Sequence, residues 1–182
     1  MEVHLILGPM FSEKSTTLFR KINRYKSIQK RVLVINHSND SRCQDEISTH
    51  DNSICKAIKV SSLQCINDEL IENSDVIAID EAQFFNDIFS FIKKWETYNK
   101  IMYISGLDGG YKRNKIGNLL DIIPLCDTIT KLNALCTVCC DGTRAPFTFR
   151  KTKVEDENNL IGGKKDYTSL CRKHYIFMQQ ER

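Results

Sequence analysis

Short apolar runs alternate with amphipathic stretches along the first 130 residues of the chain. Continuous apolar runs, which are typical of strands buried on both faces, occupy residues 3–7, 32–36, 76–80 and 101–107. Between these runs, apolar residues recur close to helical spacing, as in residues 14–29 and again from Ile88 to Trp95. The alternation predicts an α/β fold in which a mostly parallel sheet is flanked by helices.

Other stretches give weaker signals. Residues 38–53 are polar and predict a loop, residues 60–72 predict a strand end and a helix, and residues 119–125 predict a short helix. Beyond this point the pattern changes, because the last 50 residues contain half of the cysteines and show little helical periodicity. We therefore expect an α/β domain over residues 1–132 and a small second domain over residues 133–182.

The charge balance and the cysteine content narrow the class of protein. With 26 basic and 23 acidic residues, the net charge of +3 is too small to indicate a nucleic-acid binder. No apolar run reaches the roughly 18 residues of a membrane span, and no secretory signal is visible, so we expect a cytoplasmic protein without a membrane partner. In a reducing compartment the 8 cysteines favour metal ligation or free thiols over disulfides.

The segment between the first apolar run and the first helical stretch matches most of a phosphate-binding loop. It consists of Gly8, Pro9, Met10, Phe11, Ser12, Glu13, Lys14 and Ser15. In such a loop, successive backbone N–H groups and the helix N-terminus face the phosphates of a nucleotide. Lys14 would reach the outer phosphates of ATP, and Ser15 would ligate Mg²⁺. The alternative interpretation is an ordinary strand-to-helix turn.

One position departs from the phosphate-loop pattern, because Glu13 replaces its second glycine. A side chain in a left-handed conformation costs about 1–2 kcal/mol. A carboxylate about 4 Å from a phosphate would cost roughly another 1–4 kcal/mol, unless it turns to solvent. The substitution therefore predicts weakened binding of ATP.

Two acidic residues, Asp80 and Glu81, end the third apolar run. In phosphate-loop enzymes an acid at this strand end orders Mg²⁺ or its waters, which is a role that suits Asp80. Its neighbour Glu81 points to a different side, where a carboxylate can accept a hydroxyl proton during phosphoryl transfer. The alternative interpretation is a solvated strand end without a catalytic role.

Two pairs of metal-ligand residue types lie near the end of the chain. Cys136 and Cys139 form one pair, Cys171 and His174 form the other, and 31 residues separate the pairs. Four such ligands suit a tetrahedral Zn²⁺ with no open position, which indicates a structural rather than a catalytic site. Clamped at both ends by one metal ion, the intervening chain becomes a lasso that can cover a small ligand.

Seven motifs occur in order and together resemble one family. They are residues 7–12 with Lys14, Ser15 and Thr16; residues 49–51; residues 80–85; residues 106–109; the C-x-x-C of residues 136–139; residues 161–163; and the segment of Tyr167, Cys171, Arg172 and His174. Over nearly its whole length the chain is similar to the type II thymidine kinases of animal cells, many bacteria and large DNA viruses. The resemblance implies a phosphate-loop (P-loop NTPase, RecA-like) domain followed by a zinc-clamped lasso domain.

The resemblance also implies a reaction and a set of site residues. ATP would transfer its γ-phosphoryl group to the 5′-hydroxyl of thymidine, with Mg²⁺, one structural Zn²⁺ and a homotetrameric assembly. Residues 8–15, Asp80 and Gln83 would bind ATP, and Glu81 would accept the proton. The residues implied to bind thymidine are Tyr111, Thr148, Asn158, Asn159, Leu160, Ile161, Gly162 and Tyr167. Tyr111 departs from the family, which usually has phenylalanine at this position.

Two other functions stay open from the sequence. Glu13 can disable ATP binding and leave a nucleoside-binding or assembly subunit that keeps the fold. Alternatively, the Cys–His pairs can belong to a zinc-knuckle nucleic-acid binder joined to a motor-like domain. Acidic residues interrupt the basic residues of the tail, which disfavours this second alternative.

Overall fold

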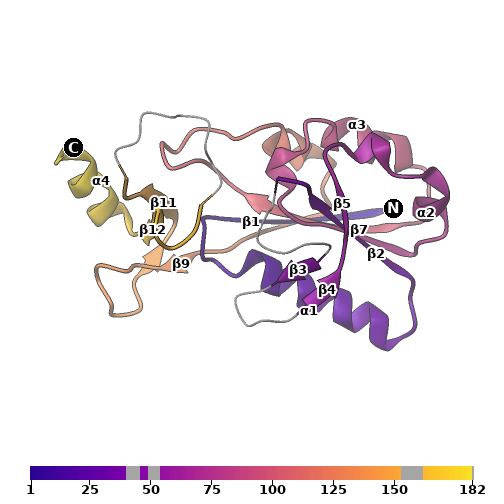
Figure 1. The fold of residues 1–182 in the computed structure, drawn as a ribbon, viewed down its shortest axis with the longest axis horizontal. Coiled ribbons are helices and arrows are strands. Elements are labelled where there is room, and N and C mark those ends of the chain that lie inside the picture. The colour runs from indigo at the N-terminus through magenta and orange to yellow at the C-terminus, as the bar shows by residue number, and fades with distance from the viewer. Residues whose placement is uncertain (40–45, 49–53, 153–161, 182) are drawn as a thin grey trace.

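The computed structural model describes residues 1–39, 46–48, 54–152 and 162–181 of the chain. Six strands form its central sheet, in the order β5-β2-β6-β7-β1-β8 (Figure 1). These strands are β1 (Glu2–Gly8), β2 (Val32–His37), β5 (Ile58–Val60), β6 (Val76–Ile79), β7 (Ile101–Leu107) and β8 (Thr128–Lys131). Every neighbouring pair in this sheet is parallel, so the predicted parallel sheet is confirmed.

Helices cover both faces of the sheet, with α1 below it and α2 and α3 above it in Figure 1. The α-helices of this part are α1 (Lys14–Ser27), α2 (Asp68–Glu72) and α3 (Ile88–Trp95). Three 3₁₀ helices accompany them: η1 (Leu63–Cys65), η2 (Ala82–Phe84) and η3 (Leu119–Leu125). Alternate residues of each strand enter different apolar clusters, as Ile77 packs with α3 and Ala78 packs with α1.

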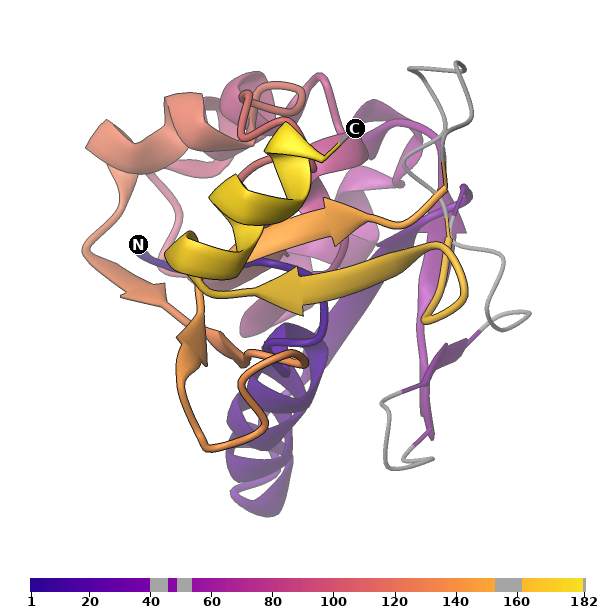
Figure 2. The same cartoon turned by 90° about the vertical axis from the view of Figure 1, so that its left-hand side faces the viewer.

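The C-terminal part of the chain has two short hairpins and one helix. Strand β9 (Ala134–Leu135) pairs with β10 (Arg144–Ala145), and β11 (Phe147–Arg150) pairs with β12 (Tyr167–Leu170), both antiparallel. Helix α4 (Arg172–Gln180) lies in front of β11 and β12 in Figure 2. An apolar cluster of its own, separate from the two clusters on the sheet, includes Phe149 and Tyr175. The boundary near residue 132 stays a prediction, and this separate cluster supports it.

One part of the secondary-structure prediction is wrong, and one helix was not predicted. Within the expected loop of residues 38–53, β3 (Glu46–Ser48) forms an antiparallel pair with β4 (Ile54–Lys56). Backbone hydrogen bonds alone create such a pair, and a polar sequence does not prevent it. Helix α4 lies in a segment whose helical periodicity is weak. The periodicity is weak because Tyr175 is the one fully buried residue of this helix. A helix that buries so little leaves almost no apolar pattern in the sequence.

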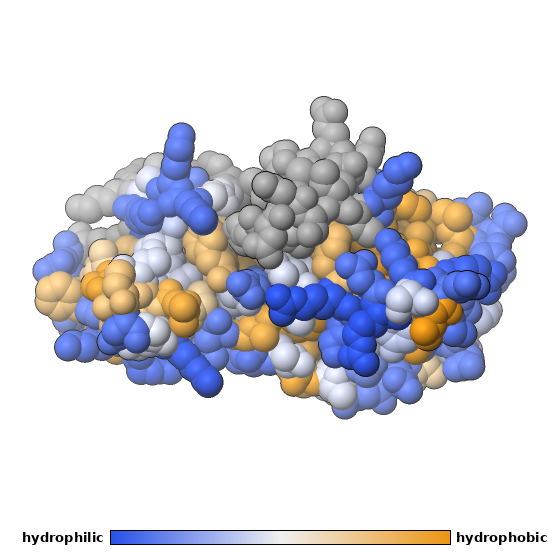
Figure 3. Space-filling view, turned by 90° about the horizontal axis from the view of Figure 1, so that it is seen from below, coloured by the Kyte–Doolittle hydropathy of each residue, from blue (hydrophilic) through white to orange (hydrophobic). Residues whose placement is uncertain are grey.

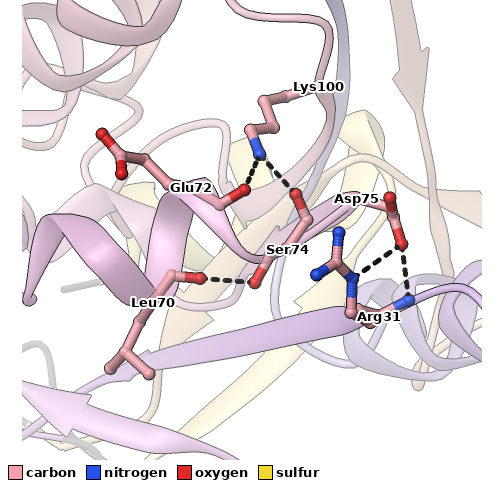
Figure 4. Close-up of polar contacts among 6 residues, drawn as sticks. All are labelled: Arg31, Leu70, Glu72, Ser74, Asp75 and Lys100. Carbon is pink, nitrogen blue, oxygen red and sulfur yellow. Dashed lines mark hydrogen bonds and ion pairs between the residues drawn. The ribbon is translucent and has the colours of Figure 1, made fainter.

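Lys100, the residue before β7, ties that strand to the end of α2 (Figure 4). Its side chain is buried, and Nζ donates hydrogen bonds of 2.6 Å to the backbone carbonyl oxygens of Glu72 and Ser74. Next to this contact, Asp75 accepts the backbone N–H of Arg31 at 2.9 Å, and the hydrogen bonds from Arg31 lower the pKa of the Asp75 carboxyl. These bonds fix the chain just before β2, β6 and β7 begin.

Hydrophilic residues make up most of the face seen in Figure 3, and hydrophobic residues interrupt it in small separate groups. Large apolar side chains that are exposed in the C-terminal part are Leu135, Val138, Ile176 and Phe177. Among the described residues, no helix is both long enough and apolar enough to cross a membrane. The described surface is therefore mixed in polarity, with part of its exposed apolar area on β9, the turn after it and α4.

Replacing Lys100 with methionine should lower the free energy of unfolding by about 2–4 kcal/mol, because two charge-assisted hydrogen bonds to backbone carbonyls are lost. Urea unfolding of the two proteins measures this change. The matched control is Lys93→Met, because Lys93 lies exposed on α3 and pairs with Glu96 at 2.8 Å on the surface. We expect the control to change stability by less than about 0.5 kcal/mol. Equal losses in both variants would contradict the role given to Lys100.

Candidate active site

The loop between β1 and α1 adopts a conformation suited to anion binding. Phe11 (φ 64°) and Glu13 (φ 61°, ψ 32°) both lie in the left-handed region. Left-handed residues within a tight loop turn neighbouring backbone N–H groups toward one side, and such a concavity attracts phosphate. Because Glu13 is the N-cap of α1, the loop leads directly into the positive end of the helix dipole. A non-glycine residue thus occupies the left-handed position.

The side chains of Glu13 and Lys14 differ in burial. Glu13 is exposed, whereas Lys14 is buried and its Nζ donates to the carbonyl oxygen of Pro9 at 2.8 Å. Ser12 Oγ donates to the same carbonyl oxygen at 2.8 Å. The Lys14 ammonium therefore lies within the loop, and water screens the exposed Glu13 carboxylate.

The backbone conformation of Glu13 is part of the fold itself. Its carbonyl oxygen accepts the N–H of Thr17 at 2.9 Å, which is the first hydrogen bond of α1. The ligand-free fold already contains the left-handed conformation, and its strain lowers the stability of the folded protein. Only a free-energy difference between the ligand-bound and ligand-free states changes an affinity. Strain that both states share has no effect on ATP affinity.

The C-terminal part holds the phosphate loop at Met10. Thr148 Oγ1 accepts the backbone N–H of Met10 at 2.9 Å, and Ser169 Oγ donates to the Met10 carbonyl oxygen at 2.8 Å. Thr148 and Ser169 lie opposite each other on β11 and β12, and both are buried. Thr148, a residue expected to bind thymidine, thus contacts the phosphate loop. Ser169 belongs to no motif, so no sequence signal points to its role.

The two acidic residues lie where β6 ends. Asp80 is almost fully buried, and its Oδ1 accepts a hydrogen bond from Ser105 Oγ on β7. Glu81 is half-buried, has a left-handed backbone (φ 51°, ψ 38°), and accepts a 2.6 Å hydrogen bond from Gln83 Nε2. Because β7 lies between β6 and β1 in a parallel sheet, both acids lie at the same edge as Gly8, about 10 Å away.

The expected thymidine residues fall into two groups in the described part of the chain. Tyr111 is half-buried, its ring lies 5.5 Å from the Arg150 guanidinium, and its carbonyl oxygen accepts the Tyr175 hydroxyl at 2.5 Å. Gly162 lies against Tyr167, because an added Cβ would come within 2.7 Å of the ring. Burial raises the pKa of the Tyr167 hydroxyl, which therefore stays protonated and able to donate.

Some predicted site residues cannot be placed. Asn158, Asn159, Leu160 and Ile161 lie outside the described residues, as do residues 49–51 of the second motif. A cavity of about 830 Å³ opens beside the phosphate loop, between the start of α1 and strands β9 and β12. Its lining includes Phe11, Ser12, Glu13, Tyr167, Lys151 and Lys164. The cavity therefore borders residues expected to bind ATP and one residue expected to bind thymidine.

The four predicted zinc ligands converge at the start of α4. The ligand atoms of Cys136, Cys139, Cys171 and His174 all lie within 4.8 Å of one another. His174 Nδ1 is 3.3 Å from the sulfur atoms of Cys139 and Cys171 and 3.6 Å from that of Cys136. Three thiol groups and one imidazole at such distances fit a tetrahedral Zn²⁺ site with no open position.

The environment of the thiols also suits a cation. Burial alone would raise the pKa of Cys136, but the backbone N–H groups of Cys171, Cys139 and Val138 and the ring of His174 lower it to about 6. Burial and the neighbouring thiols instead raise the pKa of Cys139 to about 11. A divalent cation stabilises both thiolates and removes this conflict. Cys140 stays outside the cluster, where its Sγ donates to the Thr137 carbonyl oxygen at 3.1 Å.

Comparison with known proteins agrees with the motifs. A family model described as thymidine kinase matches residues 1–175. The chain belongs to the thymidine kinase family. It is 43% identical to a thymidine kinase of Sheeppox virus, over 96% of each chain. It is also 43% identical to a thymidine kinase of Oryza sativa, covering 96% of this chain and 66% of that one. Thymidine kinase a of Arabidopsis thaliana is 42% identical over 96% of this chain and 74% of its own.

Membership of the thymidine kinase family confirms the resemblance and the phosphate-loop fold. It also gives ATP as the phosphoryl donor of this kinase. The individual site residues stay predictions, and the structure adds where each described one lies. Gly8 to Ser15, Asp80 and Glu81 share one edge of the sheet, Thr148 contacts the phosphate loop, and the Cys–His cluster forms a separate site.

Replacing Cys139 with serine should abolish metal binding, because it removes one of four converging ligands. We expect one zinc ion per purified wild-type chain and less than about 0.2 in the variant, as measured by atomic absorption. The melting temperature should fall by about 5 °C or more. Cys140→Ser is the matched control and should keep both values. Loss of zinc from Cys140→Ser, or a full zinc content in Cys139→Ser, would contradict the assigned ligand set.

Replacing Glu13 with glycine should stabilise the protein by about 1 kcal/mol, raising the melting temperature by roughly 2–4 °C, because glycine adopts the left-handed conformation without strain. Glu13→Gln keeps the strain and removes the charge, so its melting temperature should not change. Because the carboxylate is exposed and the strain belongs to the fold, ATP affinity should change less than about threefold in both variants. Calorimetric titration with ATP measures this, and a tenfold gain in Glu13→Gln would show that the charge opposes the nucleotide.

Proposed function

We propose that this thymidine kinase transfers the γ-phosphoryl group of ATP to the 5′-hydroxyl of thymidine, with Glu81 as the proton acceptor. The arrangement that carries this proposal is the common edge of the sheet, where the phosphate loop after β1 and the acids after β6 face the same space. Ligands of open parallel sheets bind at the carboxyl ends of the strands. The residues proposed to bind the phosphates and the residue proposed to accept the proton therefore lie on one side of the molecule.

The phosphate loop supplies the positive field for the ATP phosphates. The N–H groups at the start of α1 and the helix dipole favour the anion, and Lys14 adds a full charge within the loop. Lys14 Nζ can exchange the Pro9 carbonyl for a phosphate oxygen, because a flexible ammonium bonds either acceptor. Ser15 and Asp80 are the residues that would hold Mg²⁺, which would neutralise phosphate charge when bound.

Glu81 has the position of a proton acceptor for the substrate hydroxyl. It lies one residue beyond Asp80, is half-buried, and is held by Gln83 rather than free to rotate. A positioned carboxylate contributes about 10²–10⁴-fold to such a step when it can reach the hydroxyl. Its left-handed backbone, at a cost of about 1–3 kcal/mol, is a type of strain that clusters at functional sites.

The thymidine pocket is proposed at the junction of the two parts of the chain. Tyr111 on one side and Tyr167 with Gly162 on the other would enclose the nucleoside, with Thr148 at the phosphate loop. Residues 158–161 would complete this pocket through their main chain. Tyr111 carries a hydroxyl where the family usually has a bare phenyl ring, and Arg150 packs over the same ring.

The alternative of an impaired homologue rests on Glu13. It requires that the carboxylate occupies the anion site or repels the phosphates. The exposure of Glu13 and the inward position of Lys14 favour the active enzyme instead. We further propose a homotetramer in the cytoplasm. The exposed apolar residues of the C-terminal part, such as Leu135 and Phe177, supply surface that an assembly can cover.

Glu81→Gln should lower kcat by about 10²–10⁴-fold while the KM values for ATP and thymidine change little, because an amide accepts no proton. Transfer of labelled phosphate from ATP to thymidine measures both parameters. Glu69→Gln is the matched control, because Glu69 lies exposed in the first turn of α2 and should leave kcat unchanged. Full activity of Glu81→Gln would remove Glu81 from the proton-acceptor role.

A further inference from the structure

Gln83 is a buried amide that links the ends of two strands. It lies in η2, directly after Asp80 and Glu81, and its exposed fraction is only 1%. Its Oε1 accepts the backbone N–H of Leu107 at 3.0 Å, and its Nε2 donates to Glu81 Oε2 at 2.6 Å. One side chain therefore connects the C-terminal end of β7 to the carboxylate after β6.

The backbone of Leu107 fixes which way round this amide lies. A backbone N–H can only donate, so the atom of Gln83 that faces it must be the carbonyl oxygen Oε1. The NH₂ group consequently faces Glu81, where it finds a carboxylate oxygen as acceptor. Rotating the amide by 180° would place two donors together at Leu107 and two oxygens together at Glu81. The Leu107 N–H at one end and the Glu81 carboxylate at the other therefore determine the orientation of the amide.

Two glycines make the space for Gln83. A Cβ on Gly106 would lie 2.7 Å from Gln83 Oε1, and a Cβ on Gly117 would lie 2.3 Å from the Gln83 carbonyl oxygen. Gly117 has a φ of 51°, so glycine also suits its backbone. Neither distance is compatible with a real side chain. Gly106 therefore leaves room for the Gln83 amide beside β7, and Gly117 leaves room for the Gln83 backbone carbonyl.

We propose that Gln83 is a positioning residue that holds the Glu81 carboxylate in the orientation for proton transfer. This inference rests on the proposed role of Glu81 and adds how that side chain is held. Glu81 has three side-chain torsions, and a hydrogen bond to one carboxylate oxygen restricts them. Misplacement of a catalytic group by about 1 Å can cost a hundredfold in rate.

This role differs from the ATP contact expected of Gln83 from the sequence. Both ends of its amide bond protein atoms, and the side chain is buried. A residue that binds ATP changes the KM for ATP when it is replaced, whereas a residue that orients the proton acceptor changes kcat. Measuring whether the KM for ATP or kcat changes therefore distinguishes an ATP contact from a positioning role.

The first variant is Gln83→Met, which keeps the length of the side chain and removes both hydrogen bonds. We expect kcat to fall about ten- to hundredfold, with the KM for ATP and for thymidine within about threefold of wild type. Gln64→Met is the matched control, since Gln64 lies exposed in η1 and should leave both parameters unchanged. An unchanged kcat, or an effect confined to the KM for ATP, would overturn the proposal.

The second variant, Gln83→Glu, preserves shape and still accepts the Leu107 N–H, so it tests the proposal even if Gln83→Met does not fold. Its new oxygen would face Glu81 Oε2 where Nε2 now lies at 2.6 Å, so the two carboxyl groups would share a proton. We expect the acidic limb of the pH–kcat profile to move to higher pH by at least about one unit. A profile that matches wild type would overturn the proposal.

Glu81→Gln separates this inference from the proposed function. If Glu81→Gln is inactive and the Gln83 variants behave like wild type, Glu81 keeps its role and only the positioning role of Gln83 fails. If Glu81→Gln is active, the proton-acceptor assignment fails, and the positioning role fails with it.

Discussion

The hydrogen bonds of Met10 join the two parts of the protein at the phosphate loop. Both of its backbone groups are bound by buried hydroxyl side chains, with Thr148 at 2.9 Å and Ser169 at 2.8 Å. These two residues face each other across β11 and β12, so the loop is held only where that pairing is in register. Strand β12 leads directly into Cys171 of the Cys–His cluster. The Cys–His cluster, the pair of β11 and β12, and the phosphate loop thus form one continuous structure.

Among the described residues, three of the six non-glycine residues with positive φ, namely Phe11, Glu13 and Glu81, lie in the phosphate loop or at the end of β6. Glu13 and Glu81 both have positive φ angles without being glycine, and each begins a helix. Such strain persists only where surrounding contacts require it. The contacts beside Glu13 include the first hydrogen bond of α1, and those beside Glu81 include the hydrogen bond from Gln83 and the buried Asp80. Glu13 and Glu81, which are both expected to lie in the active site, thus have a backbone conformation that non-glycine residues disfavour.

The central sheet could be predicted because parallel strands covered on both faces are apolar throughout, as Val76–Ile79 is. Strand β8 could not, because all four of its residues are exposed at the sheet edge. The convergence of the Cys–His cluster was predictable from spacing alone, since two short pairs of Cys and His residues are typical of a tetrahedral metal site. Ser169 was not, because it acts through its register opposite Thr148, and register depends on contacts distant in sequence. Gln83 belongs to a motif, but only the fold shows that its amide bonds Glu81.

If thymidine and ATP bind where they are proposed, the attachment of Met10 to β11 and β12 also couples their binding energetically. Tyr167 begins β12, and Thr148 on β11 contacts the phosphate loop directly. A nucleoside that restrains these strands therefore also restrains the loop, and the nucleotide that follows loses less entropy on binding. Thermodynamic linkage makes this effect reciprocal: if the nucleoside raises the affinity for the nucleotide by some factor, the nucleotide raises the affinity for the nucleoside by the same factor.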